Sequence, residues 1–137
     1  MAIDVYLQID GIKEEQRSSG IWIGTPAGST GSLRSAGGDV QQITENRFQY
    51  VVREPCLRPG EADKLLRGFI RKDQSIDLVS QMRTGFMYID GQHNDYAFGL
   101  GDKVVVRASK QDLMAFVNPK VNEMFCVKDL VDAERKH

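Results

Sequence analysis

The stretch SSGIWIGTPAGSTGSLRSAGG, residues 18–38, joins a short apolar run to a segment made almost entirely of glycine, serine and other small residues. Glycines let a backbone approach a ligand closely, and serine and threonine hydroxyls can hydrogen-bond to ribose, phosphate and amide groups. No lysine follows the glycines and no G-x-G-x-x-G is present, so the segment is neither a P-loop nor a Rossmann fingerprint. Composition alone leaves two interpretations open: an ordinary Gly/Ser loop, or a site for a nucleotide-sized polar ligand.

Short runs rich in β-branched and aromatic residues recur on both sides of this stretch. Residues 3–9 alternate apolar and polar side chains with the period of two that a half-buried strand requires. Asp10-Gly11 predicts a turn, and Asp90-Gly91 predicts a two-residue hairpin tip, because both residue types tolerate positive φ. The spacing therefore predicts a mainly β protein, an all-β sandwich, with further strands near residues 21–25, 48–52, 68–70, 75–80, 86–89 and 103–108.

The C-terminal end has a different pattern. Apolar residues from Val121 to Val131 approximate helical spacing, with Asn118 as a cap and Pro119 at the first helical position, so we expect a short helix there. Residues 53–61 contain two prolines and a glycine and predict a long exposed loop. Because no repeat or linker divides the chain, we expect residues 1–137 to form a single domain.

Composition argues against several classes of protein. The 18 lysines and arginines against 19 aspartates and glutamates give a net charge of −1, which supplies no field to attract nucleic acid or an anionic membrane. No apolar run approaches the roughly 20 residues of a membrane span, and no secretory signal is visible, so we expect a soluble cytoplasmic protein. Cys56 and Cys126 belong to no C-x-x-C pair, and we expect two packed, reduced cysteines and no metal site.

Residues 25–38, TPAGSTGSLRSAGG, resemble the T-P-T-G-S-T-A-Y-x-L-S-A-G-G signature of the NAD kinase family. The preceding residues 18–23 are similar to the S-D-G and strand that lead into that signature, and residues 88–92, YIDGQ, look like the family's later D-G-Q hairpin. The resemblance covers most of the chain and is closest over residues 18–38. It implies the β-sandwich C-terminal domain of an NAD kinase.

In that family the enzyme uses a nucleoside triphosphate and a divalent metal to phosphorylate the 2′-hydroxyl of the adenosine ribose of NAD, which gives NADP. The resemblance therefore implies NAD as the substrate. Thr25 and Gly28 are expected to shape the loop, and Arg34 could pair with the pyrophosphate through its guanidinium fork. The positions that the resemblance places against the dinucleotide are Thr30, Gly31, Ser32 and Ser35.

The departures from the family pattern are equally informative. The G-G-D-G-T motif, which supplies the family's catalytic aspartate and helps to hold the metal and triphosphate, is nowhere in these 137 residues. We therefore expect no catalytic residue here, and ATP and a divalent metal such as Mg²⁺ only together with a missing N-terminal ATP-binding domain. Ser32 replaces the family's tyrosine, whose ring could contribute about 0.5–1.5 kcal/mol by stacking, and Ser19 replaces the aspartate of S-D-G.

Two hypotheses follow for function. The first is the NAD-binding domain of an NAD kinase homologue, inactive alone. The alternative is a non-catalytic nucleotide-binding or oligomerisation module derived from the same fold. Under either hypothesis we expect a homo-oligomer, because a β-sandwich without its neighbouring domain exposes strand edges, and these edges can pair with those of a second copy.

Three other features favour a structural interpretation. Trp22 alternates with Ile21 and Ile23, which favours the core or a subunit interface over stacking on a base. His93 with its polar neighbours fits a solvated hairpin tip better than a metal or phosphate site. The charged residues 13–17 are typical of an exposed loop.

Overall fold

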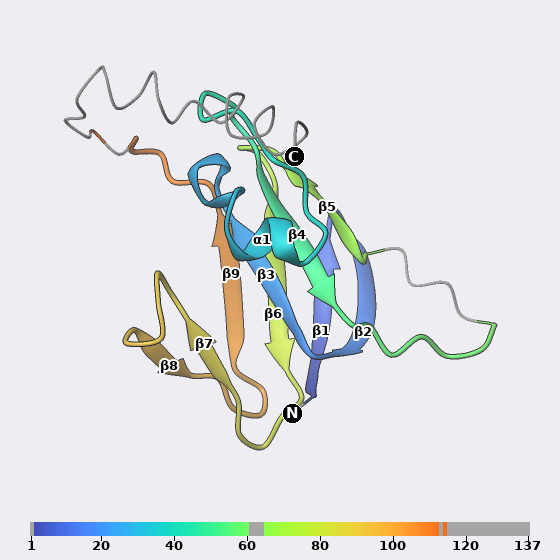
Figure 1. Cartoon of the computed structure of the whole chain (residues 1–137). Coiled ribbons are helices and arrows are strands. Elements are labelled where there is room, and N and C mark those ends of the chain that lie inside the picture. Colours follow the sequence, from blue (N-terminus) through green and yellow to red (C-terminus); the bar gives the residue numbers. More distant parts are fainter. Residues whose placement is uncertain (1, 61–64, 113, 115–137) are drawn as a thin grey trace.

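The computed structural model describes residues 2–60, 65–112 and 114, and these form two packed antiparallel sheets and a separate hairpin (Figure 1). One sheet has the order β2-β1-β6-β9 and the other the order β3-β4-β5, while β7 pairs with β8. The strands of the larger sheet are β1 (Ile3–Ile9), β2 (Ile12–Ser18), β6 (Ser75–Ser80) and β9 (Lys103–Arg107). The others are β3 (Gly20–Gly24), β4 (Phe48–Arg53), β5 (Arg67–Ile70), β7 (Phe86–Tyr88) and β8 (Asp95–Ala97).

The hydrophobic core lies between the two sheets. It is built from alternate residues of the strands, since successive side chains of a strand point to opposite faces. Each such aliphatic or aromatic side chain contributes about 1.5–3 kcal/mol by leaving water. The β-sandwich expected from the sequence is thus confirmed, and its buried core residues are Val5, Leu7, Ile9, Phe48, Tyr50, Val52, Leu65, Ile70, Ile76, Leu78 and Phe98.

The charged residues 13–17 form a strand, so the prediction of a loop there was wrong. The two-residue turn at Asp10 and Gly11, with φ of 49° and 78°, returns the chain directly alongside β1. Strand β2 then pairs with β1 along its whole length, from Ile9↔Ile12 to Ile3↔Ser18. Its charged side chains occupy a sheet edge, where they discourage pairing with another chain.

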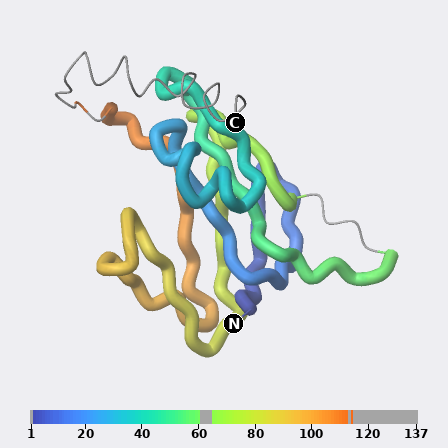
Figure 2. Tube along the Cα trace, in the orientation of Figure 1, coloured from blue at the N-terminus to red at the C-terminus, as the bar shows by residue number. Residues whose placement is uncertain are grey.

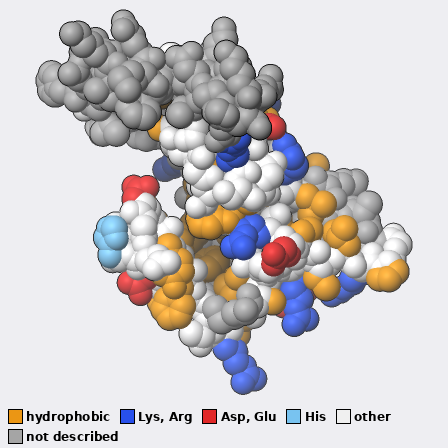
Figure 3. Space-filling model, in the orientation of Figure 1, with side chains coloured by type: hydrophobic (Ala, Val, Ile, Leu, Met, Phe, Trp, Pro, Cys, Tyr) orange, Lys and Arg blue, Asp and Glu red, His pale blue; other side chains and the backbone are white. Residues whose placement is uncertain are grey.

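The hairpin predicted around Asp90 and Gly91 is present, but its connection is longer than the predicted two-residue turn. Residues 89–94 join β7 to β8, with φ of 51° at Asp90 and 123° at Gly91. The N–H of Asn94 donates to the Gly91 carbonyl at 3.3 Å, which closes the tip. The hairpin stands beside the sandwich in Figure 2, and Figure 3 shows hydrophobic side chains exposed on this side of the molecule. The exposed large hydrophobic residues of β7 and β8 are Phe86, Tyr88 and Tyr96.

Other expectations have mixed outcomes. The C-terminal helix expected over 119–131 and Cys126 lie outside the described residues. Cys56 is exposed, so it does not pack as expected, because it lies in the loop that follows β4. Within the described part of the chain, no helix is both long and apolar enough to cross a membrane.

Candidate functional site

The Gly- and Ser-rich segment runs from β3 to β4 and lies across the outer face of the β3-β4-β5 sheet (Figure 1). It contains the 3₁₀ turn η1 (Pro26–Gly28) and the single-turn helix α1 (Ser32–Ser35). Leu33 is 3% exposed and fixes α1 against the sheet, and a Cβ added at Gly24 would overlap its Cδ1 atom. The loop can lie this close to β3 because residue 24 is glycine.

Ser29 holds the two ends of the loop together. Its side chain is fully buried, its hydroxyl donates to the Pro26 carbonyl at 2.7 Å, and its Oγ accepts the N–H of Gln41 at 2.9 Å. A buried backbone N–H needs such a partner, since an unsatisfied one costs about 1–3 kcal/mol. Ser29 is therefore a structural residue of the loop, not an exposed ligand contact.

Three more polar side chains anchor the loop to the sheet beneath it. Gln49 of β4 is 2% exposed, accepts the Asp39 N–H at 2.9 Å and donates to the Asp39 carbonyl at 2.5 Å. Gln41, also buried, donates to the carbonyl of Arg47 at 2.9 Å. Arg67 of β5 donates to the Gly37 carbonyl at 2.8 Å and pairs with Asp39 at 3.0 Å.

Sequence reasoning missed these anchors. Their partners come from other elements, so the sequence alone does not reveal them. The one available signal was Gln49, a polar residue flanked by the apolar or aromatic residues 48 and 50–52.

All seven predicted site residues are exposed and lie on the outer side of this loop. The described residues offer the hydroxyls of Thr25, Thr30, Ser32 and Ser35 no side-chain hydrogen bond, so these groups face solvent. The full set of exposed residues is Thr25, Gly28, Thr30, Gly31, Ser32, Arg34 and Ser35. Their contact with a dinucleotide stays a prediction.

Two features near the loop bear on how it could bind a ligand. Helix α1 begins at Ser32 and has only four residues, too few to build an anion site at its N-terminus. Trp22 is 39% exposed, on the face of β3 opposite to its core-packed neighbours Ile21 and Ile23, so it is not a core residue. The guanidinium of Arg53 lies 5.9 Å from the Trp22 ring centroid.

Within the described part of the chain, no group of three His, Cys, Asp or Glu side chains is placed to hold a metal ion. Two carboxylates are instead held ionised by cations. A hydrogen bond from Arg47 lowers the pKa of Glu45, and a hydrogen bond from Lys103 lowers the pKa of Asp77. Each of these carboxylates is therefore paired with a cation.

Comparison with known proteins relates most of the chain to proteins of one kind. No family model matches. The chain is 42% identical over 91 residues to a protein named "Probable NADH kinase" of Oryza sativa, covering 66% of this chain and 28% of that protein. It is 33% identical over 108 residues to the "NADH kinase" of Arabidopsis thaliana, covering 79% of this chain and 34% of that protein.

The fold agrees with two solved structures. An NAD kinase from Archaeoglobus fulgidus in complex with ATP has a TM-score of 0.60 at 24% identity, over 80% of this chain and 40% of that one. Yeast NADH kinase complexed with NADH has a TM-score of 0.63 at 19% identity, over 77% of this chain and 30% of that one. The chain thus spans about a third of the length of its curated relatives, 28% and 34%. The chain is similar to members of the NAD kinase family and corresponds to one part of them, as a C-terminal domain alone would.

Proposed function

We propose that this chain is the dinucleotide-binding domain of an NAD(H) kinase, and that residues 25–38 hold the dinucleotide whose ribose is phosphorylated. The observation that carries the proposal is the 42% identity to a protein named as a probable NADH kinase. The orientation of the loop supports it, since the loop turns its hydroxyl-bearing residues toward solvent while Ser29 and Leu33 face inward.

The contribution of the chain to the reaction is positional. Phosphoryl transfer depends chiefly on alignment of the reacting groups and on stabilisation of charge. Thr30, Ser32 and Ser35 would hydrogen-bond to the ribose and phosphates, Gly31 would let the backbone approach closely, and Arg34 would pair with the pyrophosphate. Because buried anchors already fix the loop, less ordering entropy is lost when the ligand binds.

The triphosphate and the metal require residues that the described part of the chain does not provide. The G-G-D-G-T motif is absent from the sequence, and the described residues contain no metal cluster. The predicted site residues of the loop are exposed, so the loop presents an open face. We infer that a partner domain completes the site, and that this chain alone does not turn over.

We propose NADH as the first ligand to test. Both curated relatives are named as NADH kinases, and one similar structure was solved with NADH. Ser32 stands where the resemblance expects a tyrosine, which removes about 0.5–1.5 kcal/mol of stacking, so the affinity of the isolated domain should be modest.

The test is calorimetric titration of the chain with NADH, NAD⁺ and NADP⁺. A double variant, Thr30→Ala with Ser35→Ala, should bind at least about tenfold more weakly than the wild type. Thr84→Ala, which removes an exposed hydroxyl far along the chain from the loop, should bind like the wild type. Equal affinity for the double variant would contradict the proposed site. No saturable binding of any dinucleotide would favour the alternative, an oligomerisation module without a nucleotide.

A further inference from the structure

Two rows of side chains cross the outer face of the β3-β4-β5 sheet, because paired residues of neighbouring strands point to the same side. The connection from β3 to β4 lies over the first row and leaves the second row beside it. The first row is Gly24, Gln49 and Phe69, and the second is Trp22, Val51 and Arg67. The second row therefore borders the signature loop on the same face of the sheet.

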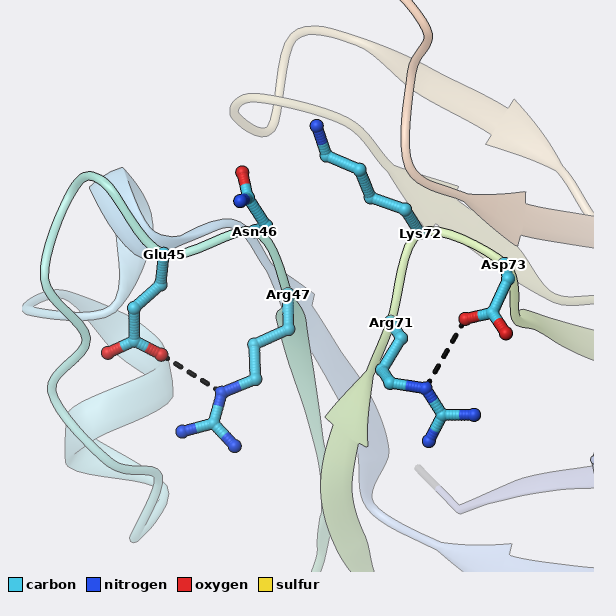
Figure 4. Close-up of a pocket in the computed structure, with 6 residues that line it drawn as sticks. All are labelled: Glu45, Asn46, Arg47, Arg71, Lys72 and Asp73. Atoms are coloured by element: carbon cyan, nitrogen blue, oxygen red, sulfur yellow. Dashed lines mark hydrogen bonds and ion pairs between the residues drawn. The ribbon is translucent and has the colours of Figure 1, made fainter.

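The aromatic residue of the first row is already covered. The guanidinium of Arg47 lies 3.9 Å from the ring centroid of Phe69, and the same guanidinium pairs with Glu45 at 3.0 Å, as a dashed line in Figure 4 marks. The other aromatic residues of β4 and β5 are buried in the core. Trp22 is thus the one exposed aromatic side chain among the described residues of this sheet.

The indole of Trp22 borders an apolar surface on one side and solvent on the other. Its neighbour in β4, Val51, is 5% exposed, whereas Trp22 is 39% exposed, which excludes the core position that the sequence favoured. Figure 3 shows hydrophobic surface beside cationic surface on the face below the loop. A single exposed apolar residue is common on proteins, so a site requires more than this exposure.

An arginine accompanies the indole. The guanidinium of Arg53 lies 5.9 Å from the ring centroid of Trp22, within the range of a cation–π contact. Arg53 is exposed, and among the described residues no carboxylate pairs with it. An aromatic face beside an available guanidinium matches the two parts of a nucleotide, a flat heteroaromatic ring and a phosphate group.

The backbone brings this pair close to the signature loop. Trp22 lies two residues before Gly24 in β3, a step of about 7 Å along the strand. Leu33 of α1 packs onto Gly24, and Ser32 and Arg34 flank Leu33 in the helix. A dinucleotide that contacts the exposed hydroxyls of this helix is long enough to lay one of its rings on the indole.

The indole also offers a ring contact that the loop itself lacks. Ser32 stands where the resemblance expects a tyrosine, so the described part of the loop presents no aromatic side chain to a ligand. A dinucleotide has two rings, and an indole can stack on either. Stacking of a base on an aromatic side chain strengthens binding by roughly 5- to 150-fold.

We propose that Trp22 and Arg53 extend the dinucleotide site, with the indole stacked on one heteroaromatic ring and the guanidinium paired with the pyrophosphate. This extension rests on the proposed function, because its ligand is the dinucleotide held by residues 25–38. Adenine and nicotinamide share the recognised chemistry, a flat ring joined through ribose to phosphate. The contact would make Trp22 a residue that selects ligands with an aromatic ring over simple phosphates.

The first experiment is calorimetric titration of the whole chain with NAD⁺ and NADH. Trp22→Leu keeps an apolar side chain in the strand and removes the ring, and it should bind at least about fivefold more weakly than the wild type. Trp22→Phe should recover part of the loss, because it restores a smaller ring. The matched control is Tyr96→Leu, which removes an exposed aromatic side chain from the separate hairpin and should bind like the wild type.

Fluorescence reports the contact directly, because Trp22 is the single tryptophan of the chain. NAD⁺ does not absorb where indole emits, so it quenches the emission only when its ring touches the indole. We expect saturable quenching by NAD⁺ with the midpoint found by calorimetry. AMP and nicotinamide mononucleotide are titrated separately, and the one whose affinity falls in Trp22→Leu identifies the stacked ring; either identity supports the contact.

Arg53→Gln tests the second half of the pair. It should weaken binding of NAD⁺ and reduce the salt dependence of the affinity, because it removes a cation from beside the pyrophosphate. Arg58→Gln, which removes an exposed cation from the loop that follows β4, should leave both unchanged. Circular dichroism and urea midpoints establish that each variant is folded.

The outcomes separate this contact from the proposed function. Binding of NAD⁺ without quenching, and with equal affinity for Trp22→Leu, would overturn the contact and leave the function intact. Absence of saturable binding to the wild type would overturn both. If Trp22→Leu instead converted an assembly into monomers in sedimentation, with its dinucleotide affinity unchanged, the indole would belong to an interface between copies, and the proposed contact would be wrong.

Discussion

Replacement of Ser29 by alanine tests whether the signature loop is held in shape from within. The change removes the acceptor of the buried Gln41 N–H and the donor to the Pro26 carbonyl. An orphaned buried donor costs about 1–3 kcal/mol, and loss of the second hydrogen bond adds about 0.5–1.5 kcal/mol. Ser29→Ala should therefore destabilise the closed loop by about 2–4 kcal/mol.

The measurement needs a probe of the loop as well as of the whole chain, because a loop can open without unfolding the sandwich. Hydrogen exchange of the Gln41 amide should accelerate by about 30-fold or more, since about 1.4 kcal/mol corresponds to a factor of ten. Urea unfolding followed by the fluorescence of Trp22, the single tryptophan, reports the global effect. Dinucleotide affinity should fall in parallel, because part of the binding energy then orders the loop.

The matched control is Ser32→Ala, which removes an exposed hydroxyl without a side-chain hydrogen bond among the described residues. Its effect on exchange and unfolding should stay within about 0.5 kcal/mol. If Ser29→Ala behaved like Ser32→Ala in both measurements, the loop would not depend on the buried hydroxyl, and the account of its shape would be refuted.

Three further predictions concern the loop and the sandwich. Gly38→Ala should destabilise by about 1–3 kcal/mol in urea, because its Cβ would lie 2.8 Å from the Leu33 carbonyl oxygen, whereas Gly28→Ala, with nothing within 4 Å, should be neutral. Arg67→Gln should cost at most about 1 kcal/mol in global stability, since its ion pair is exposed, but should speed amide exchange around the Gly37–Asp39 end of the loop. A hydrogen bond from Lys103 lowers the pKa of Asp77 from its ordinary value of 3.8. The contribution of Asp77 to the free energy of unfolding is therefore present above pH 3.8 and is lost as the pH falls through the lower pKa of the folded state. The stability difference between the wild type and Asp77→Asn, measured by urea midpoints, should accordingly shrink as the pH falls below the ordinary value of 3.8.

The sequence predicted those parts of the fold that depend on local patterns. Residues 3–9 and residues 75–80 both alternate, which decides which of their side chains are buried, and both strands occur where expected. Strand β2 was missed because its residues are mostly charged, and its pairing depends on the tight turn at Asp10 and Gly11 instead of on burial. The composition of residues 12–18 alone does not indicate that a turn outside them pairs this segment with β1.

The site was predicted in part for the same reason. The loop was recognised from its composition and its resemblance to a signature, which are both local. Its anchors were not, because Gln49 reaches Asp39 ten residues away and Arg67 reaches Gly37 across the sheet. For Trp22, the alternation of the sequence predicts that its side chain lies on the face of β3 opposite to Ile21. The alternation does not predict which of the two faces packs against the core, and Trp22 lies on the exposed one.

The two faces of the loop explain why a signature match alone does not decide function. Ser29 matches the family pattern and is buried, so it serves the shape of the loop whether or not a ligand binds. The departures Ala27, Gly31, Ser32 and Arg34 are all exposed, where a ligand would make contact. Changes confined to the outer face leave the scaffold intact and alter the contacts that select a ligand. Restoring the aromatic residue with Ser32→Tyr should therefore strengthen dinucleotide binding by up to about tenfold without changing the urea midpoint, and an unchanged affinity would place the ligand elsewhere.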